Sequence, residues 1–103
     1  MRYYLSGKIA GDAGYREKFA GYEARYARLG LRVVNPARKK DGRPWAWYMR
    51  RDIRTLTRCG GIIMLPDWKE SEGARLEHHM AEKLGMTIIY APAEDEDVRP
   101  AAL

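Results

Sequence analysis

Two acidic side chains stand at positions where helices usually bury apolar ones. In one helical segment, Asp52 lies three residues after Met49 and four before Leu56. In the next, Glu77 lies three residues before Met80, at the edge of an apolar stripe. Helical acids usually point to solvent. A carboxylate on a core-facing side therefore indicates either a satisfied buried acid or a catalytic group.

The structural explanation for each acid is an ion pair. Arginines that could supply it occur nearby in the chain, at Arg50, Arg51 and Arg75. For Glu77 we expect no strong partner, because the predicted core of its helix is the stripe Leu76, Met80, Leu84 and the acid sits beside it. Two such acids near one edge of a fold favour a catalytic role over a structural one.

Two loops have the composition of an anion site. The first, residues 6–12, contains Gly7 and Gly11, which allow a ligand to approach the backbone closely, and Lys8, which adds a positive charge. The second, residues 66–73, leads into a helix that Ser71 should cap. Free N–H groups at that helix start favour an anion, so Ser71 and Gly73 are candidate phosphate contacts. The alternative for the first loop is an ordinary strand-to-helix turn, since it lacks the glycine fingerprints of dinucleotide and P-loop sites.

Hydrophobic periodicity predicts the elements that position these residues. Short apolar runs at 3–6, 31–34, 62–65 and 87–90 are typical of buried strands. Apolar residues spaced by three and four predict helices over 15–29, 45–59 and 71–84. Polar, turn-rich loops are predicted over 37–44 and 66–70. We expect one domain over residues 1–103, with a tail from about residue 91 that shows no clear pattern.

This alternation of strands and helices predicts an α/β fold. Short apolar strands joined by helices form a parallel sheet covered on both faces. We expect a flavodoxin-like open sheet with strand order 2-1-3-4. In such sheets ligands bind beyond the carboxyl ends of the strands, where the order reverses. That point lies between the first and third strands, beside both candidate anion loops.

Composition limits the class of protein. Hydrophobic residues make up 46% of the chain and charged residues 32%, which suits a folded domain. No apolar run is long enough to span a bilayer, no signal-peptide pattern begins the chain, and Cys59 is the single cysteine. We therefore expect a cytoplasmic protein without membrane partners. His78 and His79 have no metal-ligand spacing, because adjacent helical residues point apart, so we expect no metal site.

The net charge of +5 allows two interpretations of the basic surface. Its densest region, residues 38–58, is either a solvated face or a nucleic-acid surface, and we favour the solvated face because no nucleic-acid motif accompanies it. A nucleic-acid surface would lose affinity steeply with salt.

The motifs together resemble a known superfamily. Tyr4-Leu5-Ser6-Gly7-Lys8-Ile9-Ala10-Gly11 resembles the opening motif of nucleoside 2-deoxyribosyltransferase-like proteins. These include the nucleoside deoxyribosyltransferases and the 2′-deoxynucleoside 5′-monophosphate N-glycosidases. Segments 48–53, 62–68 and 71–77 are similar to recurring pieces of small bacterial and phage members. The resemblance covers residues 3–90. Lys8 and Ala10 depart from it, standing where the glycosidases have serine and arginine.

The resemblance implies roles for individual residues. Glu77 matches the nucleophilic glutamate, Asp52 the aspartate that handles the leaving base, and Tyr4 the first-strand tyrosine that orients the site. Ser71 matches a serine near the phosphate in the monophosphate glycosidases. The opening motif and the third-helix motif thus contribute the implied substrate and phosphate contacts: Ser6, Gly7, Lys8, Ile9, Ser71 and Gly73.

The implied activity is cleavage of an N-glycosidic bond in a nucleotide or nucleoside. Such cleavage passes through an oxocarbenium-like state that a glutamate can stabilise or capture. A second acid, kept protonated by an apolar wall, assists the departing base. Water as acceptor gives hydrolysis and a second base gives transfer, with no metal or organic cofactor. The family also implies a homo-oligomer, at least a dimer. The alternative is a non-catalytic module that binds a nucleotide in the same cleft.

Overall fold

The computed structural model describes residues 1–38 and 40–98. Lys39, in the basic stretch considered above, and the last five residues lie outside the described part of the chain. Four parallel strands form one sheet in the order β2-β1-β3-β4. The strands are β1 (Arg2–Ser6), β2 (Arg32–Val34), β3 (Gly61–Met64) and β4 (Thr87–Tyr90). The predicted order and fold class are confirmed.

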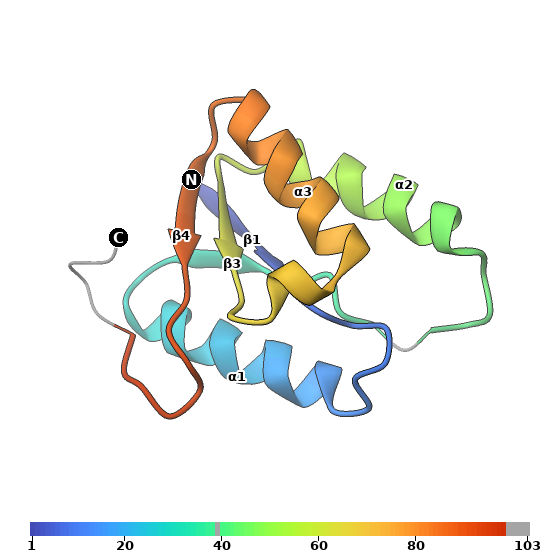
Figure 1. Ribbon diagram of the computed structural model, residues 1–103. Helices are drawn as coiled ribbons and strands as arrows, with labels where there is room; N and C mark the ends of the chain where they lie inside the picture. The colour runs from blue at the N-terminus through green and yellow to red at the C-terminus, as the bar shows by residue number, and fades with distance from the viewer. Residues whose placement is uncertain (39, 99–103) are drawn as a thin grey trace.

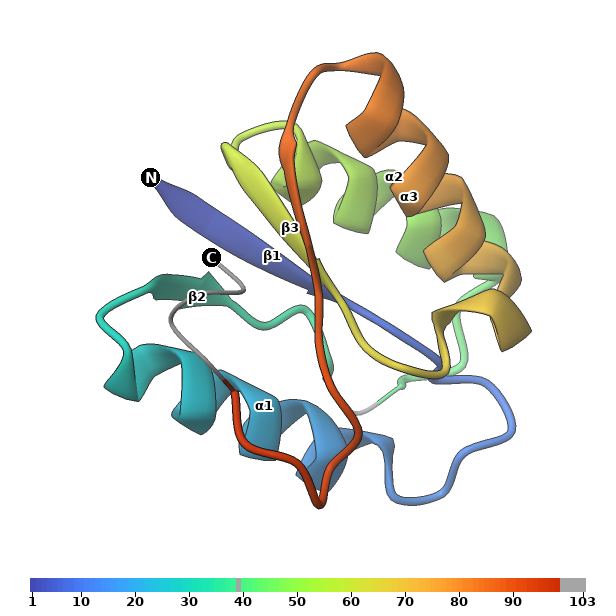
Figure 2. The same cartoon turned by 60° about the vertical axis from the view of Figure 1, so that its left-hand side comes forward.

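Helices cover both faces of this sheet. Helix α1 (Tyr15–Arg28) packs on one face, and α2 (Trp45–Leu56) and α3 (Glu72–Lys83) pack on the other (Figures 1 and 2). This division follows from strand order, because right-handed crossovers to opposite sides of β1 place their helices on opposite faces. A short 3₁₀ turn, Trp68–Glu70, occupies the predicted loop between β3 and α3.

The pleat of the strands divides the core into two clusters. Leu5 and Ile63 point toward α1, where they meet Phe19, Tyr22 and Tyr26. The alternate residues of the same strands point toward α2 and α3, and this second cluster contains Tyr4, Ile62, Met64, Leu56, Ala74 and Ala81. Side chains on a strand alternate between faces, so Tyr4 and Ser6 share the face that α3 covers.

Helix α3 buries a different face from the predicted one. Its buried residues are Ala74, Glu77 and Ala81, whereas Leu76 is 38% exposed and Leu84 is 57% exposed. The small side chains of the two alanines allow the helix to lie close to the sheet, and the larger leucines point outward. Glu77 is therefore at the centre of the buried face and not at its edge. The expected core stripe is wrong for Leu76 and Leu84.

Other differences are local. Helix α2 ends at Leu56 and not near Cys59, because the N–H groups of Arg58 and Cys59 bond to carbonyls three residues back, which tightens the last turn. The start of the tail packs on the sheet: Ala91 is buried, and the Tyr22 hydroxyl donates to the Pro92 carbonyl at 2.6 Å. No helix in residues 1–38 and 40–98 is both long and apolar enough to cross a membrane.

Candidate active site

Glu77 is the buried acid around which the site is built. Its side chain comes from the second turn of α3 and is 5% exposed. The Tyr4 hydroxyl donates to Oε2 at 2.6 Å, and the Ser6 hydroxyl donates to Oε1 at 2.8 Å. Both donors come from β1, at alternate positions whose side chains face α3. The expectation that Glu77 has no strong partner is wrong, because two strand hydroxyls satisfy it.

The surroundings of Glu77 act in opposite directions on its acidity. Burial is the largest effect and raises the pKa of Glu77 from 4.5 to about 7, while the hydrogen bonds from Tyr4 and Ser6 lower it and the nearby charge of Asp52 raises it. Burial also raises the pKa of Tyr4 well above 10, so its phenol keeps its proton and remains a donor. A carboxylate held by two donors, with a pKa near neutrality, can serve as a nucleophile or a general base.

Asp52 supplies a second buried acid from α2. It is 8% exposed, and Arg51 donates to its Oδ1 from Nε at 3.2 Å and from a terminal nitrogen at 3.1 Å. Burial raises the pKa of Asp52, and the Arg51 guanidinium opposes this rise. Asp52 therefore has the ion-pair partner that the sequence suggested, in Arg51. Its surroundings are not the wholly apolar ones that the proposed protonated acid would require. Within the described residues no hydrogen bond reaches Oδ2, which leaves that oxygen for a ligand.

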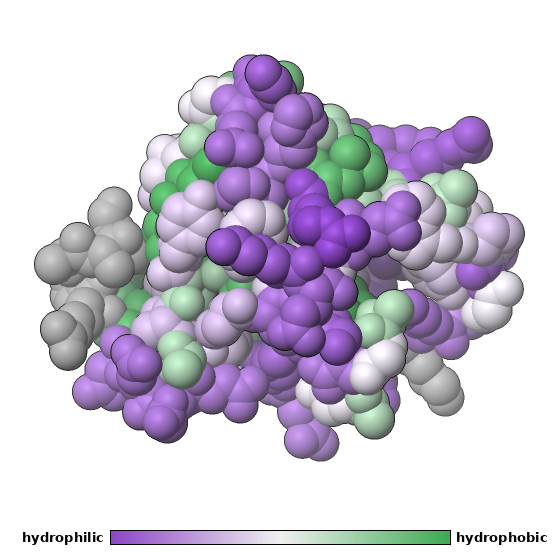
Figure 3. Space-filling model, in the orientation of Figure 1, coloured by the Kyte–Doolittle hydropathy of each residue, from purple (hydrophilic) through white to green (hydrophobic). Residues whose placement is uncertain are grey.

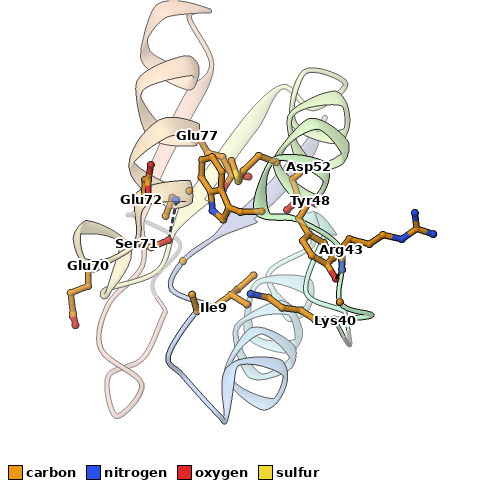
Figure 4. Close-up of a pocket in the computed structure, with 16 residues that line it drawn as sticks. Ile9, Lys40, Arg43, Tyr48, Asp52, Glu70, Ser71, Glu72 and Glu77 are labelled. Atoms are coloured by element: carbon orange, nitrogen blue, oxygen red, sulfur yellow. Dashed lines mark hydrogen bonds between the residues drawn. The ribbon is translucent and has the colours of Figure 1, made fainter.

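One cavity of about 350 Å³ brings these acids together at the carboxyl ends of β1 and β3. This volume suits a small organic ligand. Figure 4 shows Glu77 and Asp52 on one side of it, with Ile9 and Lys40 opposite. The lining residues come from three loops and two helices: Gly7, Ile9, Ala10, Lys40, Gly42, Arg43, Trp45, Tyr48, Met49, Asp52, Glu70, Ser71, Glu72, Gly73, Ala74 and Glu77.

Only some of the predicted contact residues line the cavity. Gly7, Ile9, Ser71 and Gly73 line the cavity together with both acids. Ser6 lies behind the cavity and is bound to Glu77. Lys8 is not among the lining residues, and its ammonium lies 3.4 Å from Glu70.

Packing explains why position 7 is a glycine. A Cβ at this position would lie 2.8 Å from the Leu65 side chain, so the glycine permits close packing of the two loops. Lys18 ties the same loops together, with its ammonium 2.5 Å from both Asp12 and Asp67. The backbone N–H of Lys8 also donates to Asp67 at 3.0 Å. These contacts fix the position of the loop after β1 relative to the loop after β3.

The start of α3 carries acids as well as free N–H groups. Ser71 caps the helix, accepting from the Ala74 N–H at 3.1 Å, as the sequence predicted. Glu70 and Glu72 flank this cap and both line the cavity. Their charge opposes the attraction that the helix start has for an anion.

Sequence reasoning missed the loop between β2 and α2. Lys40, Gly42 and Arg43 line the cavity, and Tyr48 follows on the first turns of α2. We expected a polar solvated loop here. The predicted topology could have indicated this loop, because it follows the carboxyl end of β2, and ligands bind beyond the carboxyl ends of parallel strands.

The fold and site together define a class of protein: an open parallel α/β domain whose small-molecule cavity contains two buried acids. The chain belongs to the family described as Domain of unknown function (DUF4406), whose model matches residues 1–90. No curated protein matches the sequence.

A solved structure shares the fold. It is a 2-deoxyribosyltransferase from the psychrotolerant bacterium Bacillus psychrosaccharolyticus, described as a biocatalyst for the synthesis of antiviral and antitumoral nucleosides. The TM-score is 0.68 at 13% identity, covering 99% of this chain and 80% of that one. At this identity the likeness shows the fold.

Proposed function

We propose that this protein cleaves the N-glycosidic bond of a nucleotide or nucleoside, with Glu77 as its nucleophile. The observation that carries the proposal is the placement of Glu77: a buried carboxylate, held by two hydroxyl donors, that opens on a cavity of ligand size. The shared fold with a 2-deoxyribosyltransferase supports the same reaction class.

The bond changes follow from this geometry. A Glu77 oxygen attacks the anomeric carbon as the bond to the base nitrogen breaks, and the electron pair leaves with the base. Each carboxylate oxygen keeps a free lone pair while accepting its hydroxyl hydrogen bond, so attack does not require those bonds to break. The base gains a proton from Asp52 when that acid is protonated, or from water.

The sugar then leaves Glu77 in a second step. Water attacks the anomeric carbon in hydrolysis, or a second base attacks it in transfer. The bond to Glu77 breaks and releases it as a carboxylate, while the proton of the attacking water or base passes to the Asp52 carboxylate or to solvent. Tyr4 and Ser6 hold the carboxylate in place through both steps, which lowers the entropic cost of reaching the transition state.

The test is release of free base. Nucleosides and their 5′-monophosphates, with ribose and 2′-deoxyribose, are incubated with the protein and followed by chromatography, with and without a second base. Glu77→Gln should lower the rate on the order of a thousandfold, since it removes the attacking charge and keeps the shape. The matched control is Glu82→Gln, an exposed acid of the same helix.

The outcome separates the alternatives. Wild-type turnover by Glu77→Gln would exclude the nucleophile assignment. Binding of a nucleotide with no base released, even over days at high protein concentration, would favour the non-catalytic binding module.

A further inference from the structure

The charges around the cavity are distributed unevenly. Four of its lining residues are acids: Asp52, Glu70, Glu72 and Glu77. Its cationic lining residues, Lys40 and Arg43, both come from the loop between β2 and α2. A ligand that carries negative charge would be repelled by Glu70 and Glu72, which flank the start of α3, and by the two buried acids when they are ionised. The loop between β2 and α2 is the wall that can accept such a charge.

Lys40 differs from the other cations near the cavity in having no carboxylate beside it. Lys8 lies 3.4 Å from Glu70, and Arg43 lies 3.6 Å from Asp41. Arg51 and Lys18 are bound to aspartates. Within the described residues no acid lies within ion-pair distance of Lys40, whose ammonium lies 5.8 Å from the centre of the Tyr48 ring. Figure 4 shows its side chain extending across the cavity toward Ile9, while the Arg43 side chain extends outward.

The loop that carries Lys40 is anchored to α2 by one side chain. The Tyr48 hydroxyl accepts from the N–H of Asp41 at 2.9 Å and from that of Arg43 at 3.2 Å, and it donates to the Asp41 carboxylate at 2.7 Å. Gly42 adopts a φ of 81°, a conformation that other residues rarely adopt, and so allows the turn. These bonds hold the cation at the mouth of the cavity, which reduces the entropy lost when it binds an anion.

From these contacts we propose that Lys40 binds the phosphate of a nucleoside monophosphate, whereas Arg43, like Lys8, already has a carboxylate beside it. This subsite lies across the cavity from the predicted one at Lys8 and the start of α3. The inference deepens the proposed function and rests on it for the nucleoside part of the ligand. A cavity of about 350 Å³ suits a single nucleotide better than a polymer.

Isothermal titration calorimetry tests the proposal. Each nucleoside and its 5′-monophosphate are titrated into the Glu77→Gln protein, in which cleavage should be too slow to affect the titration. We expect the monophosphate of at least one base to bind about tenfold more tightly than its nucleoside, as one charge-assisted hydrogen bond would give. Lys40→Ala in the same background should abolish this preference and leave nucleoside affinity unchanged.

Three further variants sharpen the result. Lys83→Ala removes the same charge from the far end of α3 and should keep the preference. Tyr48→Phe removes the loop anchor without changing charge and should reduce the preference. Lys8→Ala should keep it, because Lys8 already has Glu70 beside it.

Several results would overturn the proposal. They are equal affinity for nucleoside and monophosphate, binding of no monophosphate, or loss of the preference in Lys8→Ala but not in Lys40→Ala. Tighter binding of a short single-stranded oligonucleotide than of any monophosphate would point to nucleic acid instead. Absence of base release would contradict the proposed function but not this proposal. The preference for a monophosphate could still be measured in that case.

Discussion

Burial and hydrogen bonding act against each other on the carboxylate of Glu77. Removal from water favours the protonated acid, while the hydroxyls of Tyr4 and Ser6 favour the charged form. Burial is the larger effect, and the pKa rises to about 7. At the residue scale this balance leaves a nucleophile that is charged in roughly half of the molecules at neutral pH, and it links both reactivity and stability to pH.

The first prediction is a rate that rises with pH. Because only ionised Glu77 attacks, base release should increase about tenfold between pH 6 and pH 8, with a midpoint near 7. The measurement is the initial rate of base release across this range at a substrate concentration well below KM, where the profile reports groups of the free protein.

Tyr4→Phe provides the control for that profile. It removes a hydrogen bond that favours the charged carboxylate, so the midpoint should move to higher pH. A profile that is flat through pH 7, or one that moves to lower pH in Tyr4→Phe, would contradict the assignment.

The second prediction concerns folding stability. The pKa of Glu77 is higher in the folded protein than its ordinary value of 4.5, so the folded state binds the proton more tightly. This contribution is complete below pH 4.5 and is lost as the pH rises through about 7. The loss is on the order of 3 kcal/mol in the free energy of unfolding.

Urea unfolding at several pH values measures this loss. The free energy of unfolding of Glu77→Gln should fall less than that of the wild type between pH 5 and pH 8. Glu17→Gln, at an exposed position of α1 with no ion pair among the described residues, should follow the wild type. Parallel curves for wild type and Glu77→Gln would show that burial of this carboxylate does not cost stability.

At the scale of the elements, packing between loops decides the shape of the cavity. The loop after β1 approaches the loop after β3 closely at Gly7, where a Cβ would lie 2.8 Å from Leu65. Leu65 is fully buried, so it has little room to move away. Lys18 joins the same loops through Asp12 and Asp67.

The third prediction compares two glycines. Gly7→Ala should destabilise the protein by about 1–3 kcal/mol, because the added methyl group overpacks a buried side chain. Gly21→Ala, in the middle of α1 with nothing within 4 Å of the added Cβ, should stabilise it by up to about 1 kcal/mol. Thermal and urea unfolding of both variants check the signs. Equal effects in the two variants would mean that the contact with Leu65 relaxes easily.

At the scale of the whole molecule, a few exposed apolar side chains interrupt the otherwise charged outward side of α3. Leu76 and Leu84 lie on that face with large exposed fractions, and Trp47 on α2 is 39% exposed. In Figure 3 apolar residues gather beside α3 in the direction of α2 and again along β4, while most of that face is hydrophilic. Covering exposed apolar side chains is one driving force for chains to associate.

The fourth prediction is self-association through this face. We expect at least a dimer by sedimentation velocity at micromolar concentration. Leu76→Glu combined with Leu84→Glu should shift the protein toward the monomer without loss of secondary structure, because both side chains are exposed in the single chain. The paired control is Ala20→Glu with Ala27→Glu, which adds the same two negative charges at exposed positions of α1, on the opposite face of the sheet. A monomer at all concentrations in the wild type would exclude the prediction.

Much of the fold was determined by local sequence. Strand and helix types follow from apolar spacing. The alternation of elements and the handedness of crossovers limit the strand order to a few, and the predicted order 2-1-3-4 is the one observed. The cap of α3 at Ser71 is also local, since it depends on one side chain and an N–H three residues later. The two acids could be singled out because a carboxylate at a core-facing helical position is unusual.

The contacts within the site were decided only by the tertiary structure. Tyr4 and Ser6 reach Glu77 across more than seventy residues of sequence, and no local pattern encodes that pairing. Which face of α3 is buried depends on how closely the helix approaches the sheet, and this selected Ala74 and Ala81 over the leucines. The position of Lys40 depends on the anchor that Tyr48 provides for its loop. Periodicity describes one element at a time, whereas these contacts arise from packing between elements that are distant in the chain.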